Sequence, residues 1–326
     1  MLRLLYFKSM SIANQKLLDF FKLIVLVASV VVIYFQFKNK MISWGDLTLL
    51  RAKLCTVKAV LLLLITFLLM LLNWSLESMK WKVLMNGVED ISFFQAIKGV
   101  LGGLAIGFAT PNRVGEFVGK IAYLKSENRV NGAMLSFVGS SAQLLITIQA
   151  GLVAFIMMEY NSTNVDVFVS PLALVIFLIV TFCWFISDKL VRFFSRISWF
   201  KKWNNNFEQL ATMDKKKMLV IYGISLVRYL VFPIQYFILF YMLDANIGWF
   251  DCFINTATSY LLLAVVPTYT IAEIGARGSM NLTIFSDVAS PFVILSATIL
   301  IWIINLIIPA SMGLMIIAKT NFNKND

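Results

Sequence analysis

The sequence predicts an all-α polytopic membrane protein, with about six spanning helices and two re-entrant broken-helix hairpins arranged as two inverted repeats. Hydrophobic residues make up 60% of the 326 residues and charged residues only 14%, whereas ordinary globular chains carry about 25% charged residues. Apolar runs of roughly 20 residues, long enough to cross a bilayer, recur along the chain. Two further apolar runs are broken by proline and followed at once by charged residues.

Composition also argues against several classes of protein. The net charge of +11 comes from lysines and arginines between the apolar runs, where they set topology and meet anionic lipid, so we expect no nucleic-acid partner. The three cysteines, Cys55, Cys183 and Cys252, are scattered and histidine is absent. We therefore expect no disulfide framework, no metal site and no cofactor. The first apolar run lacks a small-residue cleavage site and is interpreted as a retained helix.

Six spans follow from the apolar runs. They are predicted at residues 23–37, 59–76, 133–158, 167–186, 218–243 and 291–318. The second span ends in the segment NWSLESMKWK, which contains four residues interpreted as interfacial anchors: Trp74, Lys80, Trp81 and Lys82. Polar residues inside the third span indicate a face turned to protein or water: Ser136, Ser140, Ser141, Gln143 and Gln149. Residues 188–213 alternate apolar and basic side chains and favour an interfacial amphipathic helix, although their second half equally fits a basic loop.

The first hairpin is predicted at residues 93–120, with a turn built by Pro111 and Gly115. Gly99, Gly103 and Gly107 repeat every four residues and share one helix face, which allows two helix backbones to approach closely. Irregular backbone and charge are tolerated at membrane depth only inside protein or beside a watery cavity. The alternative is one ordinary spanning helix that ends at Pro111.

The second half of the chain echoes the first at an offset of 156 residues, which places Pro111 opposite Pro267. After one inserted residue, Glu116 falls opposite Glu273 and Lys120 opposite Arg277. We therefore predict a second hairpin at residues 250–278, with Pro267 and Gly275 at its turn. The two repeats, residues 1–160 and 161–326, form one integrated membrane domain. Paired broken helices in inverted repeats are a plan that many transporters use.

Charge predicts the orientation of the chain. The acidic loops holding Glu159, Asp166, Asp244 and Asp251 lack bases and should face outward, whereas the basic stretch Lys189–Lys217 should face the cytoplasm. Both termini are then cytoplasmic, and the two hairpins open to opposite sides. The basic stretch Lys38–Lys58 conflicts with this orientation.

Charged side chains near the hairpin turns are the candidate functional residues, because a charge at bilayer depth costs at least roughly 2.5 kcal/mol. We expect Arg113, Lys120 and Arg277 to bind a lipid phosphate, while Glu116 and Glu273 hold the bases or exchange protons. The alternative is a structural pair within each helix, since glutamate followed by a base four residues later is a favourable order. Arg228 in the fifth span is a further candidate, or pairs with a polar neighbour such as Gln143.

Three segments carry a resemblance to a known family. TPNRVGEF resembles the proline–glycine–arginine–x–glycine–glutamate signature of the flippase-like family, the transmembrane region of lysylphosphatidylglycerol synthases. NWSLESMKWK is similar to the second span of that family, and PTYTIAEIGARGS resembles its second signature. The chain departs from the pattern at Asn112, at Glu273 and at Gly278, where glycine, glycine and an acid are usual.

The resemblance implies a membrane protein that moves or binds an anionic or polyprenyl-phosphate-type lipid in a bacterial-type plasma membrane. Larger family members carry a soluble aminoacyl-transferring domain. This chain stops about eight residues after its last predicted span, so we expect no lipid synthesis by it and a possible need for a separate lipid-modifying enzyme. A proton-coupled transporter of a small anionic solute is the alternative. An intramembrane enzyme is disfavoured, because no nucleophile and base stand at a suitable spacing.

Overall fold

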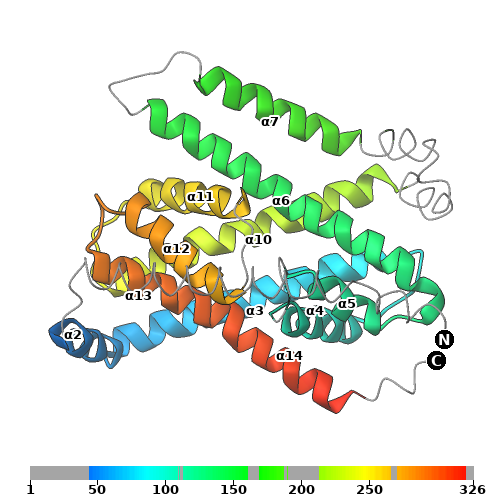
Figure 1. Cartoon of the computed structure of the whole chain (residues 1–326), viewed down its shortest axis with the longest axis horizontal. Helices are drawn as coiled ribbons and strands as arrows, with labels where there is room; N and C mark the ends of the chain where they lie inside the picture. Colours follow the sequence, from blue (N-terminus) through cyan, green and yellow to red (C-terminus); the bar gives the residue numbers. More distant parts are fainter. Residues whose placement is uncertain are drawn as a thin grey trace, which may run out of the picture.

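The fold was determined from a computed structural model, which describes residues 44–108, 110, 113–160, 169–186, 189, 213–265 and 270–320. Within these residues the regular secondary structure is entirely helical (Figure 1). The helices are α2 (Trp44–Leu54), α3 (Val57–Met85), α4 (Phe93–Phe108), α5 (Gly115–Ala122), α6 (Arg129–Tyr160), α7 (Val169–Phe185), α10 (Lys215–Met242), α11 (Trp249–Val265), α12 (Thr270–Ile284), α13 (Pro291–Trp302) and α14 (Ile308–Lys319). A π-helical segment, Ile303–Ile307, joins α13 to α14.

Four helical stretches of the described chain are long and apolar enough to cross a membrane. They are Val57–Met85, Ser126–Met158, Lys215–Met242 and Pro291–Lys319, and they match the predicted second, third, fifth and last spans. The fourth predicted span is covered by α7, which has 17 residues. The predicted first span, residues 23–37, lies outside the described residues, as does the predicted amphipathic helix apart from residues 189 and 213. The protein is thus a multi-pass helical membrane protein.

The first predicted hairpin forms a helix, a break and a second helix. Helices α4 and α5 lie against each other (Figure 1), and the glycine face of α4 makes the contact. A Cβ atom on Gly119 would collide with the backbone of Gly103, and one on Gly107 would collide with the Glu116 side chain. Gly115 begins α5 beside the Ile106 backbone. The close approach predicted from the glycine spacing is therefore confirmed, whereas Pro111 lies outside the described residues.

The second predicted hairpin also has a helix on each side of a break. Helix α11 ends at Val265 and α12 begins at Thr270, with Pro267 in the gap outside the described residues. Gly275 lies buried inside α12 and not at the turn. The prediction of a turn residue there was wrong, because α12 starts soon after the proline and already includes this position. The inverted relation of the two halves stays a prediction.

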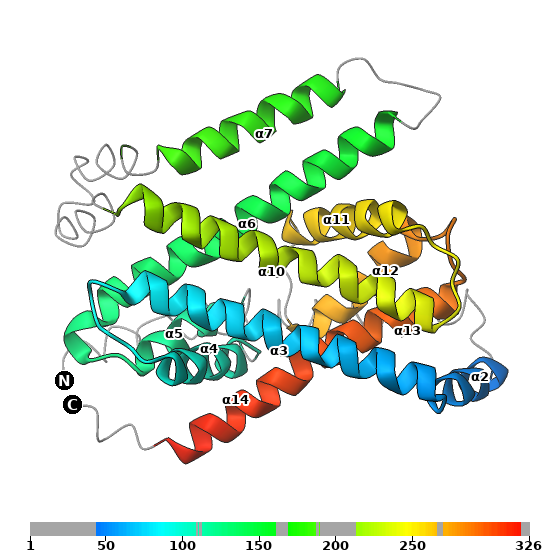
Figure 2. The same ribbon diagram turned by 180° about the vertical axis from the view of Figure 1, so that it is seen from behind.

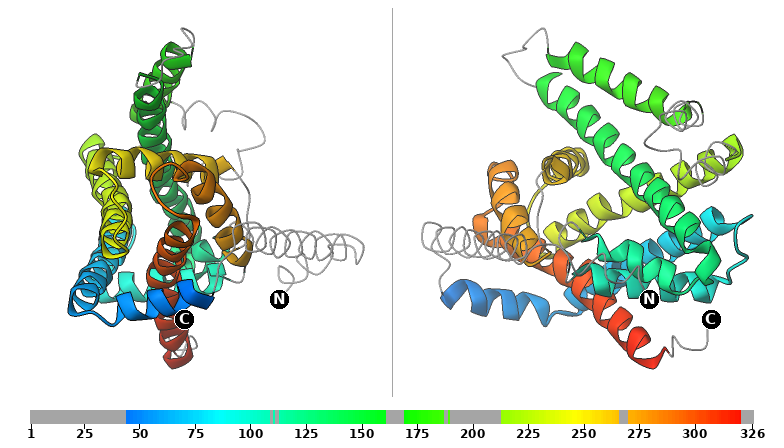
Figure 3. Two further views of the ribbon diagram at one scale, coloured as in Figure 1. Left: turned by 90° about the vertical axis from the view of Figure 1, so that its left-hand side faces the viewer. Right: turned by 45° about the vertical axis from the view of Figure 1, so that its right-hand side comes forward.

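The long helices form a bundle around these two hairpins. Figure 2 shows α3 and α10 running side by side, and α14 packs against α4. Helix α7 packs along α6 and lies at the outer edge of the bundle (Figure 3), whereas α6 also packs against α11, α10 and α5. Buried polar contacts link the bundle at depth: Asn305 Nδ2 in the π-helical segment donates to Gln235 Oε1 at 2.9 Å, and Gln235 Nε2 donates to Thr66 O at 3.0 Å.

Helix α3 continues well past the predicted end of the second span at residue 76, reaching Met85. Lys80 and Trp81 are each only 1% exposed, so their prediction as interfacial anchors was wrong. Lys82, one position further round the helix, is exposed. The extra turns of α3 carry charged residues into the interior of the bundle.

Candidate functional site

One buried carboxylate contacts three bases from three helices. Glu77 on α3 accepts from Lys120 Nζ of α5 at 2.7 Å and pairs with Lys80 Nζ at 2.8 Å, and it also accepts from Arg228 Nη1 of α10. The Glu77 side chain is 9% exposed, and those of Lys80, Lys120 and Arg228 are 1%, 6% and 12% exposed. We call these four residues the Glu77 cluster.

Neighbouring groups fix the bases of the Glu77 cluster in place. Arg228 Nε donates to Asn73 Oδ1 at 2.6 Å, and Lys80 Nζ donates to Gly139 O on α6 at 3.1 Å. Arg228 also lies over the Trp74 ring, 5.4 Å from its centroid. Removing one partner of a buried ion pair leaves an uncompensated charge and destabilises the fold. The Glu77 carboxylate and its three bases are therefore expected to stay together.

The Trp74 side chain hydrogen-bonds to the π-helical segment. Its Nε1 donates to the backbone oxygen of Asn305 at 3.2 Å, and Asn305 lies in the π-helical segment between α13 and α14. A π turn leaves backbone carbonyls without their usual helical partner, and such turns are frequent at functional sites. The segment thus ties the last membrane stretch to the ring beneath Arg228.

The second group of charges joins the two hairpins. Arg113 Nη2 donates to Glu273 Oε2 on α12 at 2.7 Å, and Arg277 Nη2 donates to Glu273 Oε1 at 2.6 Å. Glu116 is more loosely placed, with its Oε1 3.8 Å from Arg113 Nη1. We call Arg113, Glu116, Glu273 and Arg277 the Glu273 cluster. It holds two acids and two bases, so it is formally neutral.

Arg113 has an unusual backbone for its residue type. Its φ of 56° places it in the left-handed region, which residues other than glycine adopt uncommonly. Thr110 supports the turn, since its Oγ1 accepts from Gly115 N at 2.8 Å and donates to Gly107 O at 3.1 Å. This geometry directs Arg113 from the first hairpin to an acid of the second hairpin.

A cavity of about 350 Å³ lies beside both clusters. Its charged lining consists of four bases and two acids: Lys80, Arg113, Lys120, Arg228, Glu77 and Glu116. Three polar side chains of α6 complete the polar wall: Ser140, Gln143 and Thr147. Ligand cavities in proteins commonly measure about 300–1,000 Å³. The lining has a formal excess of two positive charges, so the arrangement favours an anion.

The structure brings together four of the six predicted binding residues on this cavity: Arg113, Glu116, Lys120 and Arg228. Glu273 and Arg277 do not line it, and instead reach it through the ion pair of Glu273 with Arg113. The predicted pair within the helix is confirmed for Glu273 and Arg277. It is wrong for Glu116 and Lys120, because Lys120 faces α3 and binds Glu77. The predicted contact of Arg228 with Gln143 is present at 3.4 Å.

Sequence reasoning missed Glu77 and Lys80 as residues of the site. The signal was present, because Glu77 and Lys80 stand three residues apart directly after an apolar run, with Asn73 one turn before them. Continuing the helical period past residue 76 would have placed these side chains on one face. The predicted membrane boundary there concealed the pattern.

Two comparisons with known proteins bear on this site. A comparison with curated proteins finds no match. The family described as the lysylphosphatidylglycerol synthase TM region matches residues 21–313, a range that contains both hairpins and both charge clusters. The sequence resemblance is thereby confirmed over most of the chain. This all-helical, multi-pass protein belongs to the lysylphosphatidylglycerol synthase TM region family of flippase-like membrane proteins.

Proposed function

We propose that this protein binds the headgroup of an anionic or polyprenyl-phosphate-type lipid in the charged cavity and moves the lipid across the membrane. The observation that carries the proposal is the excess of bases in a cavity lined by both clusters. Membership of a flippase-like family supports a lipid as the ligand.

The chemistry of the lining suits a phosphate. Arginine and lysine are the usual partners of phosphate oxygens, and two of each line the cavity. Glu77 neutralises only one of its three bases, and Arg113 is 34% exposed at its side chain. An anion entering here would find positive charge that the acids of the lining do not balance.

In this proposal, the two broken-helix hairpins make transport possible. Transporters built from inverted repeats bind substrate where discontinuous helices meet, and they expose the site to each side in turn. Here Arg113 and Glu273 connect the two units at 2.7 Å. We further propose the bacterial-type inner membrane, both termini cytoplasmic, and a separate enzyme that supplies the modified lipid.

The test is lipid translocation in reconstituted vesicles. Fluorescent phosphatidylglycerol that moves to the inner leaflet is protected from a quencher added outside. Lys120→Gln removes one base of the cavity yet leaves Glu77 paired with Lys80 and Arg228, so we expect translocation to fall at least about tenfold. Lys82→Gln on exposed α3 surface is the matched control and should translocate as the native protein does.

The same vesicles distinguish a lipid from a small anionic solute. We expect no uptake of inorganic phosphate that depends on Lys120. Uptake of phosphate together with unchanged lipid movement in Lys120→Gln would replace the lipid proposal by the solute transporter. Equal translocation in vesicles with and without protein would overturn the transport proposal.

A further inference from the structure

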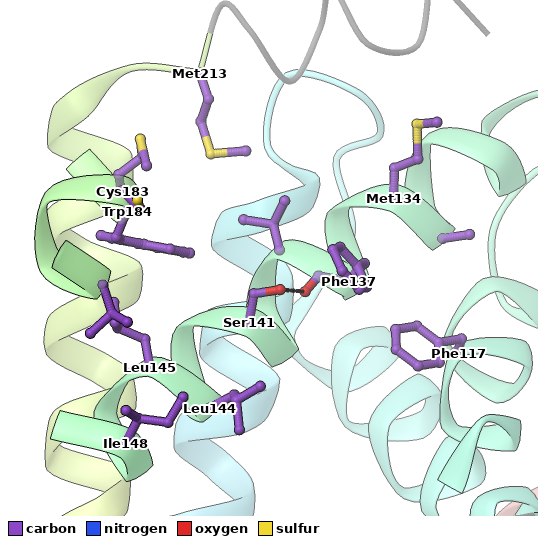
Figure 4. A pocket seen from close by; sticks show the side chains of 14 residues that line it. Phe117, Met134, Phe137, Ser141, Leu144, Leu145, Ile148, Cys183, Trp184 and Met213 are labelled. Atoms are coloured by element: carbon purple, nitrogen blue, oxygen red, sulfur yellow. Dashed lines mark hydrogen bonds between the residues drawn. The ribbon is translucent and has the colours of Figure 1, made fainter. Parts of the chain in front are cut away.

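A second, larger cavity of about 860 Å³ lies next to the charged one. Phe117 on α5 and Leu144 on α6 line both cavities, so the two spaces are adjacent. Figure 4 shows Phe117 on one side, Cys183 and Trp184 of α7 on the other, and the α6 side chains between them. The larger cavity thus begins at the wall of the charged cavity and extends along α6 toward α7.

The walls of this second cavity are apolar. They are formed by aliphatic, aromatic and sulfur-containing side chains, including Phe137, Leu145, Ile148 and Val180. Ser141 is the single hydroxyl-bearing side chain of the lining, and its Oγ donates to Phe137 O at 2.9 Å. A hydrocarbon chain would therefore meet no hydroxyl left without a partner.

We propose that the apolar cavity holds one hydrocarbon chain of the lipid whose phosphate headgroup occupies the charged cavity. This inference rests on the proposed function and adds a subsite to it. Two adjacent cavities of opposite character match the two ends of one amphiphile. The path of the chain runs from Phe117 and Leu144 along α6 to Cys183 and Trp184.

Charge, and not hydrophobicity, selects the occupant of the apolar cavity. Lipid tails are as apolar as the cavity, so a chain gains little by moving into it from the bilayer. The headgroup bound in the charged cavity keeps its own chain beside the apolar one and raises its local concentration there. Occupancy by the chain must therefore depend on the charge of the headgroup, which separates this site from ordinary annular lipid.

The experiment compares two photoreactive lipids. Phosphatidylglycerol and phosphatidylcholine each carry a diazirine in the middle of one acyl chain, and the full protein is reconstituted in phosphatidylcholine vesicles. Adducts are mapped by mass spectrometry. We expect phosphatidylglycerol to label the cavity side chains of α6 and α7 at least threefold more than phosphatidylcholine does. Labelling of Leu178, which is 56% exposed on α7 and does not line the cavity, should be equal for both lipids.

Filling the cavity gives the complementary test. Ser141→Trp on α6 and Val180→Trp on α7 each place an indole in the cavity from a different helix, so one remains informative if the other fails to fold. Each should reduce cavity labelling by phosphatidylglycerol at least threefold. Leu178→Trp is the matched control on α7 and should leave the labelling unchanged.

Binding of glycerol phosphate, the headgroup without chains, separates the failure of this inference from the failure of the proposed function. In one outcome, the filled variants lose chain labelling and still bind glycerol phosphate in a way that depends on Lys120. That result supports both the chain subsite and the headgroup site. Equal labelling by the two lipids with Lys120-dependent glycerol phosphate binding overturns the chain subsite and leaves the headgroup site standing. Equal labelling with no such binding overturns both.

Discussion

The Glu77 cluster and the Glu273 cluster contain the same kinds of side chain but differ in net charge and in the elements that they join. Glu77 is surrounded by three bases and carries two positive charges in excess with them, whereas the Glu273 cluster is neutral. The first joins α3, α5 and α10 within one part of the bundle. The second joins the two hairpins through Arg113 and Glu273. The comparison indicates that the excess positive charge and the contact between hairpins belong to separate groups of residues.

The difference also shows that matching sequence positions need not make matching contacts. Glu116 and Lys120 correspond in sequence to Glu273 and Arg277, yet only the second pair bonds within its own helix, at 2.6 Å. Lys120 instead crosses to Glu77 on α3 at 2.7 Å. A buried carboxylate already placed on α3 redirects the base, and Glu116 is left at the cavity with a 3.8 Å contact.

The largest expected effect comes from neutralising Glu77. Glu77→Gln leaves three bases without their carboxylate in a buried site, and breaking a buried ion pair costs about 3–5 kcal/mol. Glu116→Gln is the matched control, since this side chain is 27% exposed, and should cost less than about 1 kcal/mol. Denaturant unfolding in detergent micelles, followed by tryptophan fluorescence, measures both. Equal losses would remove the distinction between the clusters.

A smaller effect is expected at the contact between hairpins. A double-mutant cycle of Arg113→Gln with Glu273→Gln should give a coupling energy of about 1–2 kcal/mol, within the range for directly paired residues. The cycle of Arg113→Gln with Glu116→Gln should give at most about 0.5 kcal/mol, as expected for a loose pair. The same unfolding assay reports both cycles. A stronger coupling to Glu116 would assign Arg113 to its own hairpin.

The smallest effect on stability is expected at an exposed ion pair, which serves as a reference for the two charge clusters. Asp244, in the loop after α10, accepts from Lys53 at 2.9 Å and lies 3.7 Å from Lys58, with its side chain 61% exposed. The hydrogen bond and charge of Lys53 lower the pKa of Asp244 below its ordinary value of 3.8. The ion pair therefore contributes stability above pH 3.8, which is lost as the pH falls through the lower pKa of the folded state.

We expect Asp244→Asn to lower Tm by less than about 2 °C at pH 7. The difference from the native protein should shrink as the pH falls below 3.8, and also in high salt, because exposed charges are screened. Thermal unfolding at several pH values measures it. A Tm difference that grows toward low pH would contradict the assigned sign.

The sequence allowed the helical class, the four long spans and the first helix–break–helix to be predicted because each depends on a local pattern. Hydrophobic length predicts spans, and the spacing of Gly99, Gly103 and Gly107 predicts the face on which α5 packs. The helix α2 was not predicted, because its residues are mixed in character and lie within the basic stretch Lys38–Lys58.

The partners of the charged side chains could not be predicted in the same way. Arg113 and Glu273 are 160 residues apart and Glu77 and Arg228 are 151 apart, so their pairing depends on how the hairpins dock. Sequence spacing favoured contacts within one helix for Glu116 and Lys120. Lys120 instead pairs with Glu77, which lies on the part of α3 that continues beyond its apolar run.

The contact between Gly119 and Gly103 has a consequence for how movement is measured. A Cβ atom on Gly119 would collide with the Gly103 backbone, so the backbones of α4 and α5 are in close contact at this point. We therefore expect the two helices of the hairpin to move as one unit. A pair of spin labels on the outer faces of α4 and α5 should keep a constant separation when lipid is added, so this distance can serve as an internal reference for movements of the other helices.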